Sequence, residues 1–318
     1  MRQLPFKKKS MALESLGQKV IFVNALAAIA AVLLIFVFVF KESLPIFTNP
    51  EVRQQAGIDR LFFKQEFTEG AEPRWSWQPT SEVPKYSLAP LIIGTLKAAL
   101  IAMLVAVPLG LGAAIYSSEF APSGFKQVIK PAIELLAGIP SVVLGFFALL
   151  VMASALQNLF GLTFRLNALN AGIALGLAVI PIVFTIAEDA MSAVPDTLRH
   201  AALALGAKPW QVSFSMVVPA AAPGIGAGIV LGFGRAIGET MIVLMASGNA
   251  AIVSLSFTEP IRTMSATIAA EMAEVVFGDV HYSALFFIGA LLFVFTFIVN
   301  LGGAYILERV KIRIQGQT

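Results

Sequence analysis

The feature that most constrains this chain is a run of 21 residues, Val20 to Phe40, in which Asn24 is the only polar side chain. A helix rises about 1.5 Å per residue, so a run of this length covers a hydrocarbon core of ~30 Å. The run is longer than the apolar core of a signal peptide, and it ends in aromatic residues and Lys41 rather than at a small-residue cleavage site. The sequence therefore predicts an uncleaved anchor helix over 20–40.

Five further apolar segments are long enough to cross a bilayer when hydropathy is averaged over windows of ~19 residues. With 58% hydrophobic and only 13% charged residues, the 318-residue chain is far more apolar than an ordinary globular domain. We therefore predict an all-α membrane protein with six transmembrane helices. The five segments run from about Leu91 to Tyr116, Ala132 to Leu156, Ala168 to Ala187, Pro223 to Met245 and Leu285 to Ile306.

The basic residues predict how the chain is oriented. Lys and Arg are enriched in cytoplasmic loops, and here they gather before the first span, after the second and fourth spans, and after the last. This pattern places both termini in the cytoplasm, as tails over 1–19 and 309–318, with an external loop over 41–90 and a five-helix core over 91–308. The net charge is +3, and the basic residues cluster beside the spans rather than in a stripe. This distribution indicates no nucleic-acid partner. The basic residues concerned are Arg2, Lys7, Lys8, Lys9, Lys19, Lys126, Lys130, Arg199, Lys208, Arg309, Lys311 and Arg313.

Between the fourth and fifth predicted spans, the cytoplasmic loop 188–219 carries the signals of a short helix. Pro195 followed by Asp196 or Thr197 is a typical helix start, and Gly206 is a typical stop. The alanines in between allow close approach of a partner surface, while Gly206 permits the turn that sends the chain back toward the next span. A helix over about 197–208 would be suited to transmit force.

The order of residues in this loop is specific. His200-Ala201-Ala202 is followed by three residues, Gly206, nine residues, and then Met216 to Pro219. This resembles the EAA loop of ABC importer permeases, usually Glu-Ala-Ala-x3-Gly-x9-Ile-x-Leu-Pro, with His200 in place of the glutamate. The resemblance implies that the short helix docks in a groove of a separate ATPase subunit. The resemblance assigns the role of ATPase coupling-loop residues to five positions: His200, Ala201, Ala202, Gly206 and Pro219.

Four other segments narrow the family. They are Leu88–Leu96 opening the second span, Ala132–Ser141 opening the third, Gly234–Met241 in the fifth, and Thr267–Glu274 before the sixth. Together with the loop they cover residues 85–308, and they resemble the permease subunit of the phosphate-specific ABC importer, of the type with a GRALGET-like motif. The resemblance implies the type I importer fold, a six-helix subunit that pairs with a second permease subunit.

Two charges interrupt the apolar fifth span. Arg235 and Glu239 are four residues apart, so on one helix they share a face and can meet. Counted from Pro223, Arg235 lies roughly 18 Å along the helix, near the midplane of a ~30 Å core, where a charge costs at least ~2.5–3.5 kcal/mol. Three roles remain open for the pair: a structural ion pair, an anion site in which the arginine fork binds an oxyanion, or a gate in which Glu239 holds Arg235 until the subunits rearrange.

The other charged residues near the spans are expected to be structural. Lys97 is expected at the interface near the outer end of its span, and Glu134 is expected to pair with Lys130 at i,i+4. Glu271 and Glu274 are expected to make a structural or binding-protein contact outside, and His281 to be a satisfied residue at the outer edge.

The sequence offers no catalytic or metal-binding motif. It has no cysteine, P-loop, Gly-x-Ser-x-Gly or HExxH pattern, so we expect no enzyme activity, no metal site and no cofactor on this chain. ATP hydrolysis, with its ATP and Mg, is therefore expected on separate ATPase subunits.

These observations and the resemblance predict a multi-pass permease subunit of a bacterial inner-membrane ABC importer that moves inorganic phosphate by alternating access. The expected partners are a second permease subunit, two ATPase subunits, an external phosphate-binding protein and the lipid bilayer. One alternative is the same machine importing another oxyanion, such as sulfate or molybdate. Another is a membrane scaffold that signals phosphate status to a sensor kinase. A third is an ion-coupled secondary transporter, which has no need of a loop that resembles an ATPase dock.

Overall fold

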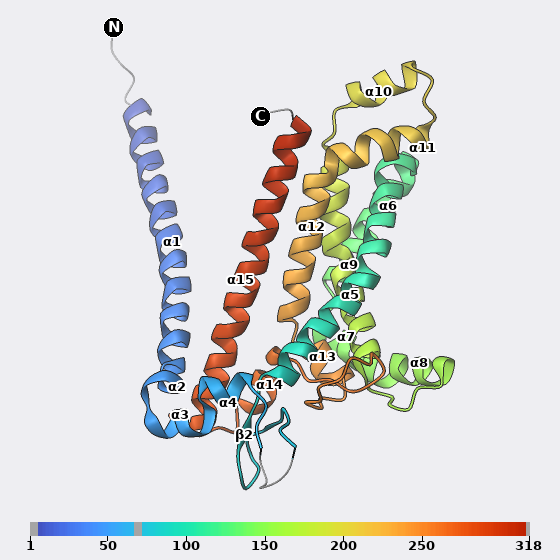
Figure 1. Ribbon diagram of the computed structural model, residues 1–318. Helices are drawn as coiled ribbons and strands as arrows, with labels where there is room; N and C mark the ends of the chain where they lie inside the picture. Colours follow the sequence, from blue (N-terminus) through green and yellow to red (C-terminus); the bar gives the residue numbers. More distant parts are fainter. Residues whose placement is uncertain (1–5, 67–71, 316–318) are drawn as a thin grey trace.

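The computed structural model describes residues 6–66 and 72–315, and within these ranges the chain is mostly helical (Figure 1). The six predicted spans are confirmed, because six of the described helical segments are long and apolar enough to cross a membrane. The ends of the predicted tails, 1–5 and 316–318, lie outside the described residues, while the rest of both tails continues the first and last long helices. The spans are Gly17–Thr48, Ala89–Phe120, Ser141–Phe160, Ala168–Ser192, Pro209–Gly238 and Val280–Arg309.

The long helices are α1 (Phe6–Ser43), α5 (Ala89–Ile115), α9 (Ala168–Ser192), α12 (Val218–Gly238) and α15 (Val280–Gln315). Three π-helical turns are inserted, η1 (Tyr116–Phe120) after α5, η2 (Ala148–Met152) between α7 and α8, and η3 (Ser213–Val217) before α12. The shorter helices are α2 (Pro45–Thr48), α3 (Pro50–Ala56), α4 (Ile58–Phe62), α6 (Ser123–Ala137), α7 (Ser141–Phe147), α8 (Ala153–Phe160), α10 (Asp196–Ala204), α11 (Pro209–Val212), α13 (Met241–Ala246) and α14 (Met264–Glu271).

The centre of the molecule is the packing of α5 and α12 on α9. Small residues let these backbones approach closely, as is typical of membrane helices. A Cβ atom at Gly172 of α9 would lie only 2.4 Å from the Cβ of Ile101 on α5, and one at Gly232 of α12 would lie 3.0 Å from Val179 of α9. On the other side, α15 packs on α12 and α1 packs on α15, so the anchor helix lies at the edge of the bundle (Figure 1).

The third span differs from its predicted bounds. The sequence predicts one helix over 132–156, but α6 ends at Ala137 and the span runs over Ser141–Phe160. The break lies at Gly138–Pro140, where proline has no N–H to continue the ladder and the preceding residue is pushed out of the helical region. Hydropathy alone does not detect this break, because all the residues around it are apolar or small.

Residues 41–66 and 72–90 lie at the end of the molecule opposite α10 (Figure 1). Helices α2 to α4 are followed by a short hairpin, β1 (Trp77–Gln78) with antiparallel β2 (Lys85–Tyr86), in which Trp77 is opposite Tyr86. Ile46, Leu61 and Leu285 are all buried in the core that joins this region to the beginning of α15.

Candidate functional site

Arg235 lies near the end of α12, on a face that no described part of the chain covers. Gly228, Gly232 and Ala236 form the buried stripe of α12 against α9, whereas Leu231 and Arg235 are exposed. The exposed stripe lies between the face toward α9 and the face toward α15. The side chain of Arg235 is 48% exposed, so about half of it is open to what lies outside this chain.

Arg235 and Glu239 meet as predicted, but they do not lie on one helix. Helix α12 ends at Gly238, and Glu239 has extended backbone angles of φ −68° and ψ 134°. The main-chain oxygen of Glu239 accepts a hydrogen bond of 2.7 Å from Ser265 Oγ of α14, which fixes the chain in this break. The side chains still approach each other, with 3.9 Å between Arg235 Nη2 and Glu239 Oε2. This is an ion pair, but the distance is too long for a hydrogen bond.

Arg235 therefore keeps its donors available. Within residues 6–66 and 72–315, Glu239 is the carboxylate within ion-pair distance, and no group accepts a hydrogen bond from the guanidinium. The carboxylate of Glu239 is largely buried, at 9% exposure, while the arginine is open. Such an arrangement can present a planar fork of N–H groups to an oxyanion, with a carboxylate beside it.

The predicted short helix of the coupling loop is present as α10. Pro195 precedes it, and Gly206 follows with a left-handed φ of +84°, so the predicted start and stop are both found. The amide N–H groups of Gly206 and Ala207 bond back to Leu203 and Ala202, at 2.9 and 3.2 Å, and close the helix end.

The residues of the EAA-like loop divide between two faces. His200 and Ala201 are exposed, whereas Ala202 is buried in a core cluster that includes residues of α9, α11 and α12. Pro219 is the second residue of α12, directly after the π-helical turn η3. Helix α9 continues to Ser192, so the first residues of the predicted loop 188–219 are helical.

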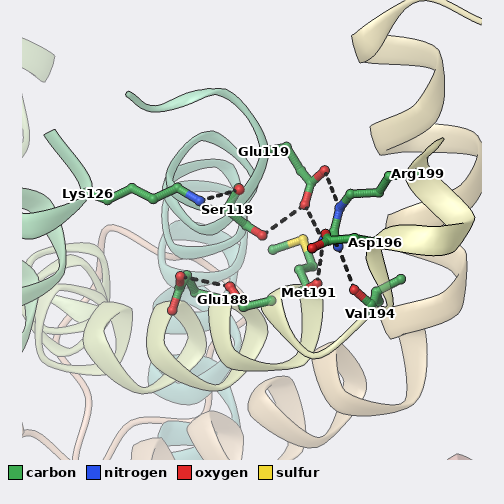
Figure 2. A network of polar contacts seen from close by, with 9 residues as sticks. Ser118, Glu119, Lys126, Glu188, Met191, Val194, Asp196 and Arg199 are labelled. Carbon is green, nitrogen blue, oxygen red and sulfur yellow. Dashed lines mark hydrogen bonds and ion pairs between the residues drawn. The ribbon is translucent and has the colours of Figure 1, made fainter. Parts of the chain in front are cut away.

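Arg199, which stands out in the sequence only as a basic loop residue, connects α10 to neighbouring elements (Figure 2). The Nη2 atom of Arg199 lies 3.0 Å from Glu119 Oε1 in η1 and 2.8 Å from the carbonyl oxygen of Met191 in α9. Its Nη1 atom donates to the carbonyl of Val194 and to Asp196 Oδ1. The hydrogen bond to Glu119 raises the pKa of the Arg199 guanidinium further above its usual range. The sequence separation of 80 residues between Glu119 and Arg199 explains why no local pattern indicated this contact.

Two expectations about lysines are wrong. Lys130 does not pair with Glu134; its Nζ lies 2.8 Å from Glu188 and 2.6 Å from Asp189, on the neighbouring helix α9. These hydrogen bonds, first to Asp189 and then to Glu188, raise the pKa of the Lys130 amine above its usual value. Lys97 is buried rather than interfacial, and its Nζ donates to the main-chain oxygens of Ser254 and Ser256.

At the opposite end, Glu271 is the centre of a second polar cluster. Its carboxylate lies 2.8 Å from Arg262 Nη1 and 2.9 Å from His281 Nε2, and it accepts a bond of 3.1 Å from Trp77 Nε1. These partners come from the hairpin, from the segment before α14 and from α15, so the predicted structural role of Glu271 and His281 fits. Burial, with Asp279 and Glu271 nearby, raises the pKa of Tyr86 to about 12.

The cluster around Glu271 lines a cavity of about 690 Å³ that Glu274 also borders. In the described part of the chain, no three His, Cys, Asp or Glu side chains come close enough together to hold a metal ion.

Comparison with known proteins identifies the fold and the family. The model of the family described as binding-protein-dependent transport system inner membrane component matches residues 106–312. The chain is 37% identical over 257 residues to the phosphate transport system permease protein PstC of Mesorhizobium japonicum, covering 75% of this chain and 78% of the relative. It is 29% identical over 327 residues to the probable phosphate transport system permease protein PstC of Methanocaldococcus jannaschii, covering 95% and 98%.

Solved structures with a similar fold are ABC importers. A bacterial alginate ABC transporter in complex with its alginate-bound periplasmic protein matches with a TM-score of 0.58 at 16% identity, over 92% of this chain and 96% of that one. The inward-facing methionine transporter MetNI matches with a TM-score of 0.55 at 16% identity, over 70% and 96%. At this identity the likeness shows the fold, and it confirms the predicted type I importer permease architecture. Because the family model covers more than half of the chain, this multi-pass inner-membrane protein belongs to the family of binding-protein-dependent transport system inner membrane components.

Proposed function

We propose that this chain is the permease subunit of an ATP-driven importer that carries inorganic phosphate across the inner membrane by alternating access. The observation that carries the substrate assignment is the open guanidinium of Arg235, in a chain whose relatives are named phosphate transport system permease proteins. A charged group on a membrane-spanning helix is costly unless a partner or a polar pathway satisfies it. Arg235 therefore marks the pathway.

The carboxylate beside Arg235 favours phosphate over other tetrahedral oxyanions. At neutral pH, phosphate still carries a proton that can be donated to a carboxylate, whereas sulfate and molybdate carry none. Glu239 is placed to accept that proton's hydrogen bond while the Arg235 fork holds the other oxygens. The 3.9 Å gap between the side chains leaves the guanidinium free to exchange Glu239 for the substrate, which fits a transient site rather than a tight one.

The energy for transport comes from partner subunits in this proposal. The sequence has no P-loop, so two ATPase subunits would bind ATP and Mg, and one of them would dock on α10 of this chain. His200 and Ala201 are exposed there, and Leu205, just after α10 and outside the spans, is 89% exposed, which marks a surface made for a protein partner. If the ATPase subunits dock from the cytoplasm, the end of the molecule that carries α10 is cytoplasmic. The beginning of α1 and the end of α15 lie at the same end (Figure 1).

A second permease subunit would complete the pathway, and we expect it to be a paralogue. The stripe of α12 that carries Leu231 and Arg235 is uncovered in the described chain, so a second subunit is expected to face it across the pathway. An external phosphate-binding protein would deliver the substrate to the end that carries residues 41–90. Closure of the ATPase pair would then displace α10 and rock α12, which exposes the Arg235 region to each side in turn.

The test is transport by the complete complex in liposomes with ATP inside. We expect ATP-dependent uptake of radiolabelled phosphate that excess sulfate or molybdate does not compete, and that Arg235→Met abolishes while the complex still assembles. Uptake of sulfate or molybdate in place of phosphate would assign the other oxyanion and overturn the proposal.

A further inference from the structure

Besides the buried Ala202, the docking helix α10 is attached to the rest of the chain through the side chain of Arg199, whose N–H groups are all used in hydrogen bonds. A guanidinium has five N–H groups, and five bonds are formed here: Nε and Nη2 to Glu119 at 3.4 and 3.0 Å, Nη2 to Met191, and Nη1 to Val194 and Asp196. Figure 2 shows the arginine between these acceptors. No other side chain type offers this number of donors in a fixed plane.

The acceptors belong to three different parts of the fold. Glu119 lies in η1, the π-helical turn that ends the span of α5. The carbonyl of Met191 belongs to the last turn of α9, where it also accepts a bond of 3.1 Å from the Val194 N–H, and the carbonyl of Val194 belongs to the link into α10. Arg199 therefore joins the ends of α5 and α9 to the helix that carries it.

Burial separates the strong contacts from the weak one. The side chains of Arg199 and Glu119 are 18% and 8% exposed, so water screens their pairing little. Asp196 is 80% exposed, and its bond to Arg199 resembles the surface ion pairs that contribute little. Of the two ion pairs of Arg199, the one that holds α10 is therefore the pair with Glu119, which crosses from α10 to η1.

The far end of this connection is the proposed pathway. Helix α5 packs along α9, and α12 packs on both of them, meeting α9 through Gly228 and Gly232. A displacement of α10 that pulled on Glu119 and Met191 would move α5 and α9 as one body, and α12 would follow.

We propose that Arg199 is a positioning residue that clamps the docking helix to α5 and α9, so that movement of α10 is converted into movement of the pathway helices. The inference rests on the proposed function, because it assumes an ATPase that moves α10. It concerns a residue that touches neither the substrate nor, in this arrangement, the ATPase.

The experiment compares three variants of the complete complex in liposomes: Arg199→Gln, Arg199→Lys and Glu119→Gln. The measured quantity is phosphate transported per ATP hydrolysed. We expect this ratio to fall roughly tenfold in Arg199→Gln, within the range for residues on a coupling route, while ATP hydrolysis continues. The ratio should fall less in Glu119→Gln. In Arg199→Lys it should lie between those of Arg199→Gln and wild type, because lysine keeps the charge but not the full set of donors.

Lys130→Gln is the matched control. Lys130 also bridges to α9, at 2.8 Å from Glu188 and 2.6 Å from Asp189, but in the described chain it forms no ion pair or side-chain hydrogen bond with α10, so its loss removes ion pairs to α9 without loosening α10. We expect an unchanged transport ratio. A second readout uses spin labels on cysteines introduced at Leu203 of α10 and Phe120 of η1, both exposed positions in a chain without native cysteine. The distance distribution should broaden in Arg199→Gln and stay narrow in Lys130→Gln.

The outcomes are separable from those of the proposed function. A wild-type complex that moves no phosphate would contradict the function itself. If the wild type transports and Arg199→Gln keeps the wild-type ratio and the narrow distance distribution, the clamp is wrong while the function stands. Equal losses in Lys130→Gln, or failure of both Arg199→Gln and Glu119→Gln to assemble, would show a general structural role and would also overturn the clamp.

Discussion

Arg199 and Arg235 show two opposite ways in which this chain treats a guanidinium. Arg199 directs its five N–H groups at five bonds within the chain and is 18% exposed. Arg235 is 48% exposed, and Glu239 stands 3.9 Å from it without a hydrogen bond. Each arginine has a glutamate beside it, so the difference lies in the backbone that surrounds the pair.

The surroundings of the two guanidinium groups explain the difference. Arg199 reaches the end of α9 and the link into α10, where main-chain oxygens accept hydrogen bonds from it. Arg235 lies in the last turn of α12, but in the described chain no main-chain oxygen accepts a hydrogen bond from its guanidinium, and Glu239 is its charged partner. A guanidinium that reaches carbonyl oxygens of its own chain is satisfied by them and stabilises the chain, whereas one that reaches none must be satisfied from outside. The first arrangement suits a fixed joint and the second suits a site for a transient anion.

The largest effect that would test this contrast is on transport, at Arg235. Arg235→Lys keeps the positive charge but loses the planar fork, and each hydrogen bond to a charged group contributes about 1.5–3 kcal/mol. We expect phosphate uptake by the complete complex to fall at least about tenfold. Uptake in liposomes, normalised to assembled permease, measures this directly.

The control for that prediction removes both charges at once. In the double variant Arg235→Met, Glu239→Leu, the pair is replaced by apolar side chains, which is often tolerated for stability. Assembly should therefore persist and transport should be lost. Wild-type uptake in both this variant and Arg235→Lys would make the pair a dispensable packing device.

The next effect is on stability, which should depend more on Arg199 than on Arg235. Arg199→Gln leaves a largely buried Glu119 and two carbonyls with fewer partners, and should lower the free energy of unfolding by about 2–3 kcal/mol. Arg235→Gln removes only a long, half-exposed pair and should change it by less than about 0.5 kcal/mol. Unfolding of the isolated chain in lipid bicelles would compare them, and equal losses would remove the distinction between the two arginines.

A smaller effect is expected at the turn that follows α10. Gly206 has φ +84°, and no atom lies within 4 Å of a Cβ built there, so Gly206→Val acts through the backbone alone. A β-branched residue in the left-handed region costs about 1–2 kcal/mol, which should reduce co-purification of the ATPase about fivefold or more. Gly161→Val is the matched control, because Gly161 has φ +62° and equal space but follows α8 at the opposite end (Figure 1). Loss of the ATPase in both variants would point to general destabilisation instead of the turn.

The sequence predicts well what depends on local pattern. Hydropathy finds all six spans, and the Pro195 and Gly206 signals bound α10 closely. Local pattern fails where a neighbouring helix competes. Lys130 prefers Glu188 and Asp189 across a helix interface to Glu134 on its own helix, because two carboxylates from another element offer more than one at i,i+4.

The sequence allows the residues of the candidate site to be predicted, but not their arrangement in space. Arg235 and Glu239 stand out in an apolar segment, yet the end of α12 at Gly238 depends on the contact of Glu239 with Ser265, 26 residues further along the chain. Arg199 gave no signal beyond its charge, since the carbonyls and the carboxylate that it binds are brought together only by the packing of α5 on α9.

The smallest effect is expected at His200, where this chain departs from the usual glutamate of the loop. His200 is exposed on α10 one residue after Arg199, and it forms no ion pair or side-chain hydrogen bond within the described residues. If the contrast between the two arginines holds, the attachment of α10 depends on Arg199, and the neighbouring exposed position can change without loosening it. His200→Glu should then leave transport-linked ATP hydrolysis within about twofold of wild type, as is usual for an exposed substitution away from a structural contact. A loss as large as that of Arg199→Gln would show that His200 makes a specific contact with the ATPase, and that the hold on α10 depends on its outer face as much as on the buried arginine.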